Sequence, residues 1–187
     1  NTKSETEAIY KEYAGLLLAP LEVTGGFFIS SPGSAGAVAS GKDEEIYVLS
    51  ARRSNMKDRI NKGTWTIALS GSTSAVLGDA GATLLELTDD SVNSNPTATP
   101  VGDRYNIVSG SAGTVKKTAA VTNFGFFYPD MGIMVFSAAE LSASIPGTSG
   151  STALSGITVF DTDTQKGFGF SSDTNSDEKT ALRFINC

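Results

Sequence analysis

The sequence predicts a mainly β fold, an antiparallel sandwich or barrel-like sheet with two short helices; an α+β arrangement is the alternative. Many short runs combine β-branched and aromatic residues, and in the run 65–69 apolar positions alternate with small or polar ones. Loops rich in Gly, Ser and Asn separate these runs, and neither a regular strand–helix–strand order nor a fixed-period repeat is visible. These features favour strands that are joined by turns rather than by crossover helices.

The first element is expected to be an amphipathic helix over about residues 5–18. Ser4 and Glu7 have the spacing of a capping box, in which each side chain satisfies a free N–H group of the first helical turn. Pro20 then ends the helix. We expect its apolar face to pack on the chain's own sheet rather than on a neighbouring molecule. That face consists of Ile9, Tyr13, Leu16 and Leu17.

Most of the remaining elements are expected to be strands. Trp65 lies in an alternating run and is expected to point into the core. A second capping box, Ser137 with Glu140, predicts a short helix that Pro146 and Gly147 end. Segments 31–41 and 91–100 are expected to be loops. The expected strands cover residues 25–29, 45–49, 65–69, 82–87, 104–108, 124–128, 132–136, 157–160, 168–170 and 182–185.

We expect a single β-rich structural domain spanning residues 1–187, with a sub-boundary in the loop 91–103 as the alternative. The chain is 40% hydrophobic and 18% charged, which are values typical of a globular domain. It starts at Asn1 rather than Met, and it stops inside the alternating run 181–186. We therefore expect it to be part of a longer polypeptide.

Histidine is absent and the only cysteine is Cys187, which excludes several classes of site. Ser-His-Asp and Cys-His catalytic groups cannot form, and nearly all zinc sites are excluded. A single cysteine cannot form an internal disulfide, so folding in a reducing compartment such as the cytoplasm is expected. We expect no catalytic, cofactor-binding or metal-binding residues, and we expect that the chain is not an enzyme.

The charge balance argues against nucleic acid as a partner. The chain has 14 basic and 20 acidic residues, a net charge of -6, whereas nucleic-acid binding needs a basic surface. The basic residues at 52–62 alternate with acidic ones at 43–58, which predicts a solvated, salt-bridged surface. Neither a membrane-spanning run of about 20 apolar residues nor a signal peptide is visible. We therefore expect no nucleic-acid partner and no membrane partner. We also expect no small-molecule substrate.

Three polar motifs have some features of binding or catalytic sites, and each is interpreted as structural. The run 161–165 begins like a calcium-binding loop with Asp161 and Asp163, but Ser172 stands where the closing Glu would be. Asp89 and Asp90 are interpreted as the end of a strand. The segment 110–117 lacks the spacing of a phosphate-binding loop, and its residues alternate instead of opening a helix. A cross-link from its lysines to an Asn or Asp would require a buried lysine.

The aromatic side chains could form either a core or a sugar-stacking platform. Trp65 and the aromatic residues of the run 124–128 are the candidates. Aromatic residues that recur in an apolar strand are more often core residues, so we favour packing in the interior.

Three stretches of the sequence together resemble a known family. They are EIYVLS (45–50) with MKDRINKGTWTI (56–67), YNIVSG (105–110), and FGFFYPDMGIMV (124–135) followed by a serine-capped helix. The amino-acid sequences of these stretches and their order along the chain resemble a segment of the large virion structural proteins of T4-like tailed bacteriophages, especially those of marine cyanobacteria. The resemblance covers about residues 45–141, and Lys62 stands where that family often has Pro.

The resemblance implies a structural component of a phage particle, in the tail, neck or baseplate, that is assembled in the cytoplasm of the bacterial host. Its partners would be other virion proteins and copies of itself, and no functional residues carry over. The alternative is a carbohydrate-binding or adhesion module on a phage fibre or a cell surface. A third class, a glycan-cleaving enzyme, would need two carboxylates facing each other across a cleft.

Overall fold

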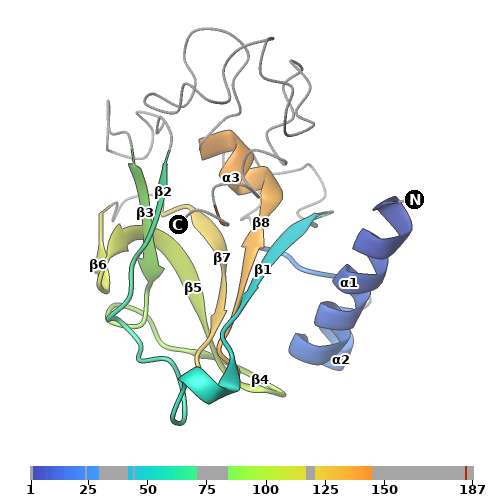
Figure 1. Cartoon of the computed structure of the whole chain (residues 1–187), viewed down its shortest axis with the longest axis horizontal. Helices are drawn as coiled ribbons and strands as arrows, with labels where there is room; N and C mark the ends of the chain where they lie inside the picture. The colour runs from blue at the N-terminus through green and yellow to red at the C-terminus, as the bar shows by residue number, and fades with distance from the viewer. Residues whose placement is uncertain are drawn as a thin grey trace, which may run out of the picture.

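The computed structural model describes residues 2–23, 25–29, 42–43, 45–70, 84–116, 121–144 and 184. These residues form a mainly β structure, as the sequence predicts, in which one curled antiparallel sheet is accompanied by short helices (Figure 1). The helices are α1 (Thr2–Leu17), α2 (Pro20–Val23), α3 (Ala138–Ser144) and a 3-10 turn at Arg53–Asn55. The strands are β1 (Ile46–Ser50), β2 (Ile67–Ser70), β3 (Leu84–Asp89), β4 (Thr97–Thr99), β5 (Gly102–Ser111), β6 (Thr114–Val115), β7 (Asn123–Tyr128) and β8 (Ile133–Ser137).

The sheet has the strand order β1-β8-β7-β5-β3-β2, and β4 and β6 pair with the two ends of β5. Each of these pairings is antiparallel. The pairing of β5 with β7 shifts register between Ile107 and Val108, because β7 carries one extra residue there. That bulge turns Phe124 to the same face of the sheet as Phe127, although three positions separate them.

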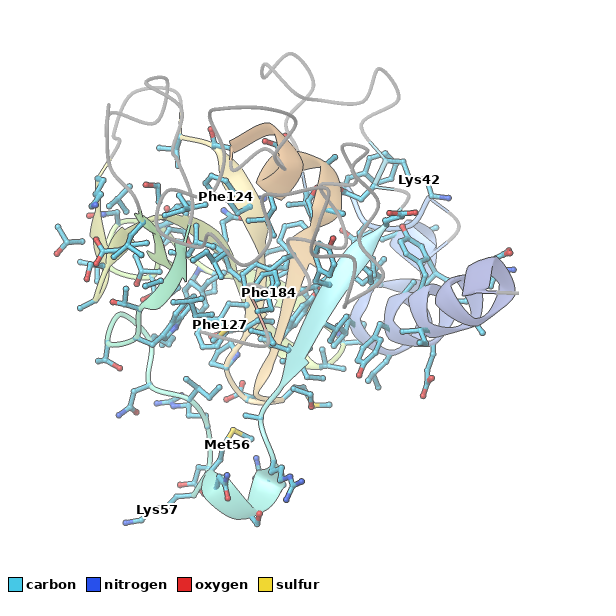
Figure 2. The ribbon with its side chains drawn as sticks, turned by 45° about the horizontal axis from the view of Figure 1, so that its top comes forward. Lys42, Met56, Lys57, Phe124, Phe127 and Phe184 are labelled. Atoms are coloured by element: carbon cyan, nitrogen blue, oxygen red, sulfur yellow. The ribbon has the colours of Figure 1, made fainter. Side chains whose placement is uncertain are left out.

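One apolar core fills the concave side of the curled sheet. Figure 2 shows Phe124, Phe127 and Phe184 in the middle of the molecule, far from the turn that carries Met56 and Lys57. The ring of Phe184 lies 5.5 Å from that of Tyr47 and 4.8 Å from that of Phe136. The buried members of this core are Leu69, Leu85, Leu87, Tyr105, Ile107, Phe124, Phe127, Met134, Phe136 and Leu141.

A second apolar core lies on the other face of β7, β8 and β1, under α1. Helix α1 packs on its own sheet, as expected, but through only part of the expected face. Leu17 is fully buried, whereas Ile9 and Leu16 are 51% and 43% exposed. The contacting side keeps Tyr13 and Leu17 of the expected face, and it contains Tyr10 and Ala14 in place of Ile9 and Leu16. The two cores explain why nearly every residue of β7 and β8 is buried.

Several expected boundaries were wrong. Segment 25–29 is not a strand, and β2 starts at Ile67 rather than at Trp65. The expected strand 82–87 is β3, shifted toward the C-terminus, and the expected loop 91–100 contains β4. Phe184, expected in a strand over 182–185, is helical. The expected loop 31–41 and the strands 157–160 and 168–170 lie outside the described residues.

The two predicted capping boxes had different outcomes. Helix α1 begins at Thr2, so Ser4 lies inside the helix and cannot cap it from that position. Pro20 starts the separate helix α2, which agrees with its preference for the first turn. At α3, the Glu140 N–H donates to Ser137 Oγ at 3.2 Å, which confirms the second capping position.

Candidate functional site

A buried polar cluster joins the N-terminal segment to the start of α3. Asp43 is 2% exposed, and Ser137 is fully buried at the end of β8. One carboxylate oxygen of Asp43 accepts a hydrogen bond from the Ser137 hydroxyl, and the other accepts the Ile29 N–H at 2.8 Å. The backbone N–H of Asp43 donates to the Phe27 carbonyl at 2.9 Å. These bonds attach residues 27–29, which are not part of the sheet, to its edge.

A serine beside a carboxylate could be a nucleophile and its base, but this pair lacks the access that such chemistry needs. The Ser137 side chain has no exposed surface, and its oxygen already holds the first turn of α3. Burial raises the pKa of Asp43, and the hydrogen bonds from Ser137 and Ile29 oppose that rise only in part. The arrangement is that of a structural tether.

Asp43 corrects one expectation from the sequence. The charge pattern of the sequence places Asp43 among the acidic residues that mix with basic ones on the surface. In the structure, Asp43 lies inside the protein. A carboxylate is buried when donors are supplied from elsewhere in the fold, and Ile29 and Ser137 are distant from it in sequence. Of these two partners of Asp43, the sequence pattern identifies only Ser137, as a helix cap.

Asp89 and Asp90 lie at the end of β3, as expected, and both carboxylates are used within the fold. Asp89 is fully buried, and both of its oxygens lie 2.9 Å from the Gly63 nitrogen. Asp90 accepts from the backbone and the side-chain nitrogens of Asn106, each at 3.0 Å. These bonds fix the 60–64 turn and hold the end of β3 to the middle of β5, so both carboxylates have structural partners within the described residues.

The segment 110–116 forms a β-hairpin of β5 and β6 and does not open a helix, in agreement with its alternation. Its turn places Gly113 at a φ of 76°, and the Gly113 N–H donates to Thr88 Oγ1 at 2.9 Å. The same hydroxyl donates to the Trp65 carbonyl at 2.8 Å. The Lys116 side chain is 34% exposed, and its ammonium lies 3.0 Å from a Glu86 carboxylate oxygen. The Gly113 N–H is therefore not available to a phosphate, and Lys116 lacks the burial that a cross-link needs.

The aromatic candidates are core residues rather than a sugar platform. The run 124–128 is buried throughout, and Trp65 meets Phe127 edge to face with ring centres 5.3 Å apart. Arg104 covers the ring of Phe126, with 4.2 Å between the guanidinium carbon and the ring centre. Burial raises the pKa of Tyr128 to about 12, and the charge of Arg104 opposes the rise.

The basic residues at 52–62 make contacts of more than one kind. Arg53 Nη1 donates to the Asp58 carbonyl at 2.8 Å, so it closes its own loop instead of pairing with a carboxylate. Lys62 reaches the Tyr105 hydroxyl at 2.7 Å. Arg52 and Lys57 are exposed. The solvated surface that the sequence predicted is present at Arg52 and Lys57, while Arg53 and Lys62 help to hold the loop.

The N-terminal segment carries several large apolar side chains that the described part of the chain leaves partly or largely exposed. Leu21 is 93% exposed, the highest fraction among the exposed large apolar residues. Exposed apolar side chains that form a contiguous patch are typical of a contact with another molecule. This N-terminal apolar surface consists of Ile9, Leu16, Leu21, Val23 and Phe28. The spacing of α1 predicted an apolar face but did not show which residues stay outside.

Comparison with protein-family models, with curated proteins and with solved structures found no match to this chain. Within the described ranges, no helix is long and apolar enough to cross a membrane. The same part of the chain contains no group of three or more acidic or cysteine side chains arranged to hold a metal ion. Asp161 and Asp163 lie outside it.

Proposed function

We propose that this chain is a structural component of a tailed bacteriophage particle, in the tail, neck or baseplate, and that it acts through protein–protein assembly. The N-terminal apolar surface is the observation that carries the proposal. In the described part of the chain, the polar side chains that could have formed a reactive group bind other parts of the same fold. The five apolar side chains of the N-terminal apolar surface are instead exposed. Assembly requires shape and apolar anchors and no reactive group.

The sequence resemblance over residues 45–141 supplies the kind of particle. Those residues include all eight strands of the sheet, the 3-10 turn and the start of α3. The resembling stretches therefore belong to the packed sheet, which suits a protein whose role is to form part of a larger particle.

Immunogold labelling of intact phage particles with an antibody against this chain tests the proposal. Labelling at one fixed location on the tail, neck or baseplate is the expected result. Particles that never carry the label, while the chain is found only free in the infected cell, would contradict it.

A variant pair then tests the role of the N-terminal apolar surface. Leu21→Ser should leave the melting temperature unchanged, because Leu21 is almost fully exposed, but should reduce incorporation into particles. Val92→Ser is the matched control: it also removes an exposed apolar side chain, 68% exposed, but in the turn after β3. Equal incorporation of both variants would remove the N-terminal apolar surface from the proposal. Specific retention of the chain on bacterial glycans would favour the adhesion alternative.

A further inference from the structure

Strand β1 is an edge of the sheet whose outer side has no partner strand within the described residues. The Ala51 N–H donates to the Gly132 carbonyl, and the Ala138 N–H donates to the Glu45 carbonyl. In an antiparallel ladder these pairs alternate, so Tyr47 and Leu49 also direct their backbone groups to β8. The N–H and C=O groups of the even-numbered residues, 46, 48 and 50, therefore point away from the sheet.

This edge has none of the features that usually protect an exposed strand. Its sequence, IYVLS, contains no charge, no proline and no bulge, and every residue remains partly or fully exposed. Its two sides continue the two cores: Tyr47 and Leu49 pack against the inner core, and Ile46 and Val48 against the core under α1. A strand added here would extend the sheet and lengthen both cores.

The opposite edge, β2, is built differently. It has four residues, and Thr66, just before it, bonds by its side chain to Ser111 and to the Ala112 N–H. The hairpin that contains β6 thus reaches the beginning of the β2 edge. Of the two edges of the sheet, β1 offers the longer apolar ladder.

We propose that β1 pairs antiparallel with β1 of a second copy of this chain, so that the two sheets become continuous across a twofold axis at Val48. The exposed charges that flank the strand favour this occupant: Glu45 precedes it and Arg52 follows it. Antiparallel pairing brings the acidic end of one strand beside the basic end of the other, whereas parallel pairing would bring like charges together. Arg52 is exposed and extended, so it continues the line of β1.

The register of this pairing follows from the N–H and C=O groups of residues 46, 48 and 50, which point away from the sheet. With Val48 opposite Val48 of the second copy, Ile46 lies opposite Ser50, and the outward N–H and C=O groups of all three positions meet. This forms about six backbone hydrogen bonds across the axis. On the inner face, Tyr47 of one copy then lies opposite Leu49 of the other, an aromatic–aliphatic pair of the kind that stabilises sheets. The inference deepens the proposed function, because it names one surface of the assembly and rests on the need for contacts between copies.

Sedimentation velocity of the 187-residue chain over a range of concentrations tests the pairing. The expected result is a monomer–dimer equilibrium that Ser50→Pro weakens by about tenfold or more, because proline removes an outward N–H without touching the ladder to β8. Ser50→Thr, which keeps the N–H, is the matched control and should dimerise like the parent chain. Arg52→Glu should also weaken the dimer, most strongly at low salt. Melting curves identify any variant that fails to fold.

A spin label at position 50 locates the contact independently of folding effects. In Ser50→Cys with Cys187→Ser, the proposed register places the two labelled backbone positions about 14 Å apart, four residues along and one strand across. A monomer at every concentration, or a dimer in which the two labels are far apart, would overturn the β1 pairing. A monomer that still enters particles would leave the proposed function standing. A β1-paired dimer that particles never contain would instead remove the proposed function.

Discussion

Replacing Trp65 with Ala should destabilise the fold without any selective loss of binding. Trp65 is half-buried before β2, and its ring meets that of Phe127 edge to face at 5.3 Å. Truncating a buried aromatic residue to Ala typically costs about 3–5 kcal/mol. Because Trp65 is only half-buried, we place the cost near the lower end, at about 3 kcal/mol, which corresponds to a fall in melting temperature of about 6–12 °C.

Trp65→Phe provides the matched control. The Trp65 Nε1 atom is buried and has no hydrogen-bond partner among the described residues. Phe removes that atom and keeps a ring against Phe127, so its cost should be well below that of Ala.

Thermal unfolding followed by circular dichroism is the assay, because Trp65 is the only tryptophan and its fluorescence is lost in both variants. A soluble Ala variant with an unchanged melting temperature would refute the core placement. If that variant had also lost binding to a glycan, the carbohydrate interpretation would gain support.

Three further predictions use the same unfolding assays. Leu17→Ala should cost about 2–5 kcal/mol while its exposed neighbour Leu16→Ala stays within about 0.5 kcal/mol, and the reverse order would mean that α1 is turned the other way. Gly113→Ala should cost about 1–3 kcal/mol, because its φ is 76° and a Cβ would lie 2.8 Å from the Gly63 carbonyl oxygen. Gly15→Ala in α1, where a Cβ meets nothing within 4 Å, should instead stabilise the fold by up to about 1 kcal/mol. Equal effects of the two substitutions on the free energy of unfolding would contradict both placements. Burial raises the folded-state pKa of Asp43 above its ordinary 3.8, so its contribution to stability is complete below that value and is lost as the pH rises through the folded-state pKa. Urea unfolding between pH 3 and pH 7 should therefore show a fall in wild-type stability relative to Asp43→Asn, and parallel curves would contradict the raised pKa.

The sequence predicted well where the pattern is local. Strands β7 and β8 and the cap at Ser137 were placed within one residue, because an apolar run ending at a tight turn or at a helix cap carries its own boundaries. The fold class followed from the same signals. The aromatic run 124–128 was correctly assigned to the core, although the bulge that turns Phe124 inward had no visible signal.

The failures concern contacts between distant segments. The run 25–29 has the composition of a strand, but its hydrogen bonds go to Asp43, to the Tyr10 hydroxyl and to the Asn123 side chain instead of to the backbone of a neighbouring strand. The face of α1 was misjudged because helical spacing allows both Ile9 and Tyr10 to begin a stripe, and only the sheet beneath selects Tyr10. The exposed edge of β1 could not be found from the sequence either, since strand order is a property of the whole sheet.

Quantitative mass spectrometry of purified phage particles, with labelled peptides of this chain as standards, tests the central proposal most directly. The account predicts a fixed number of copies per particle that stays constant through repeated purification and that falls for Leu21→Ser but not for Val92→Ser. Purified, infectious particles that contain no copies of the chain would contradict it.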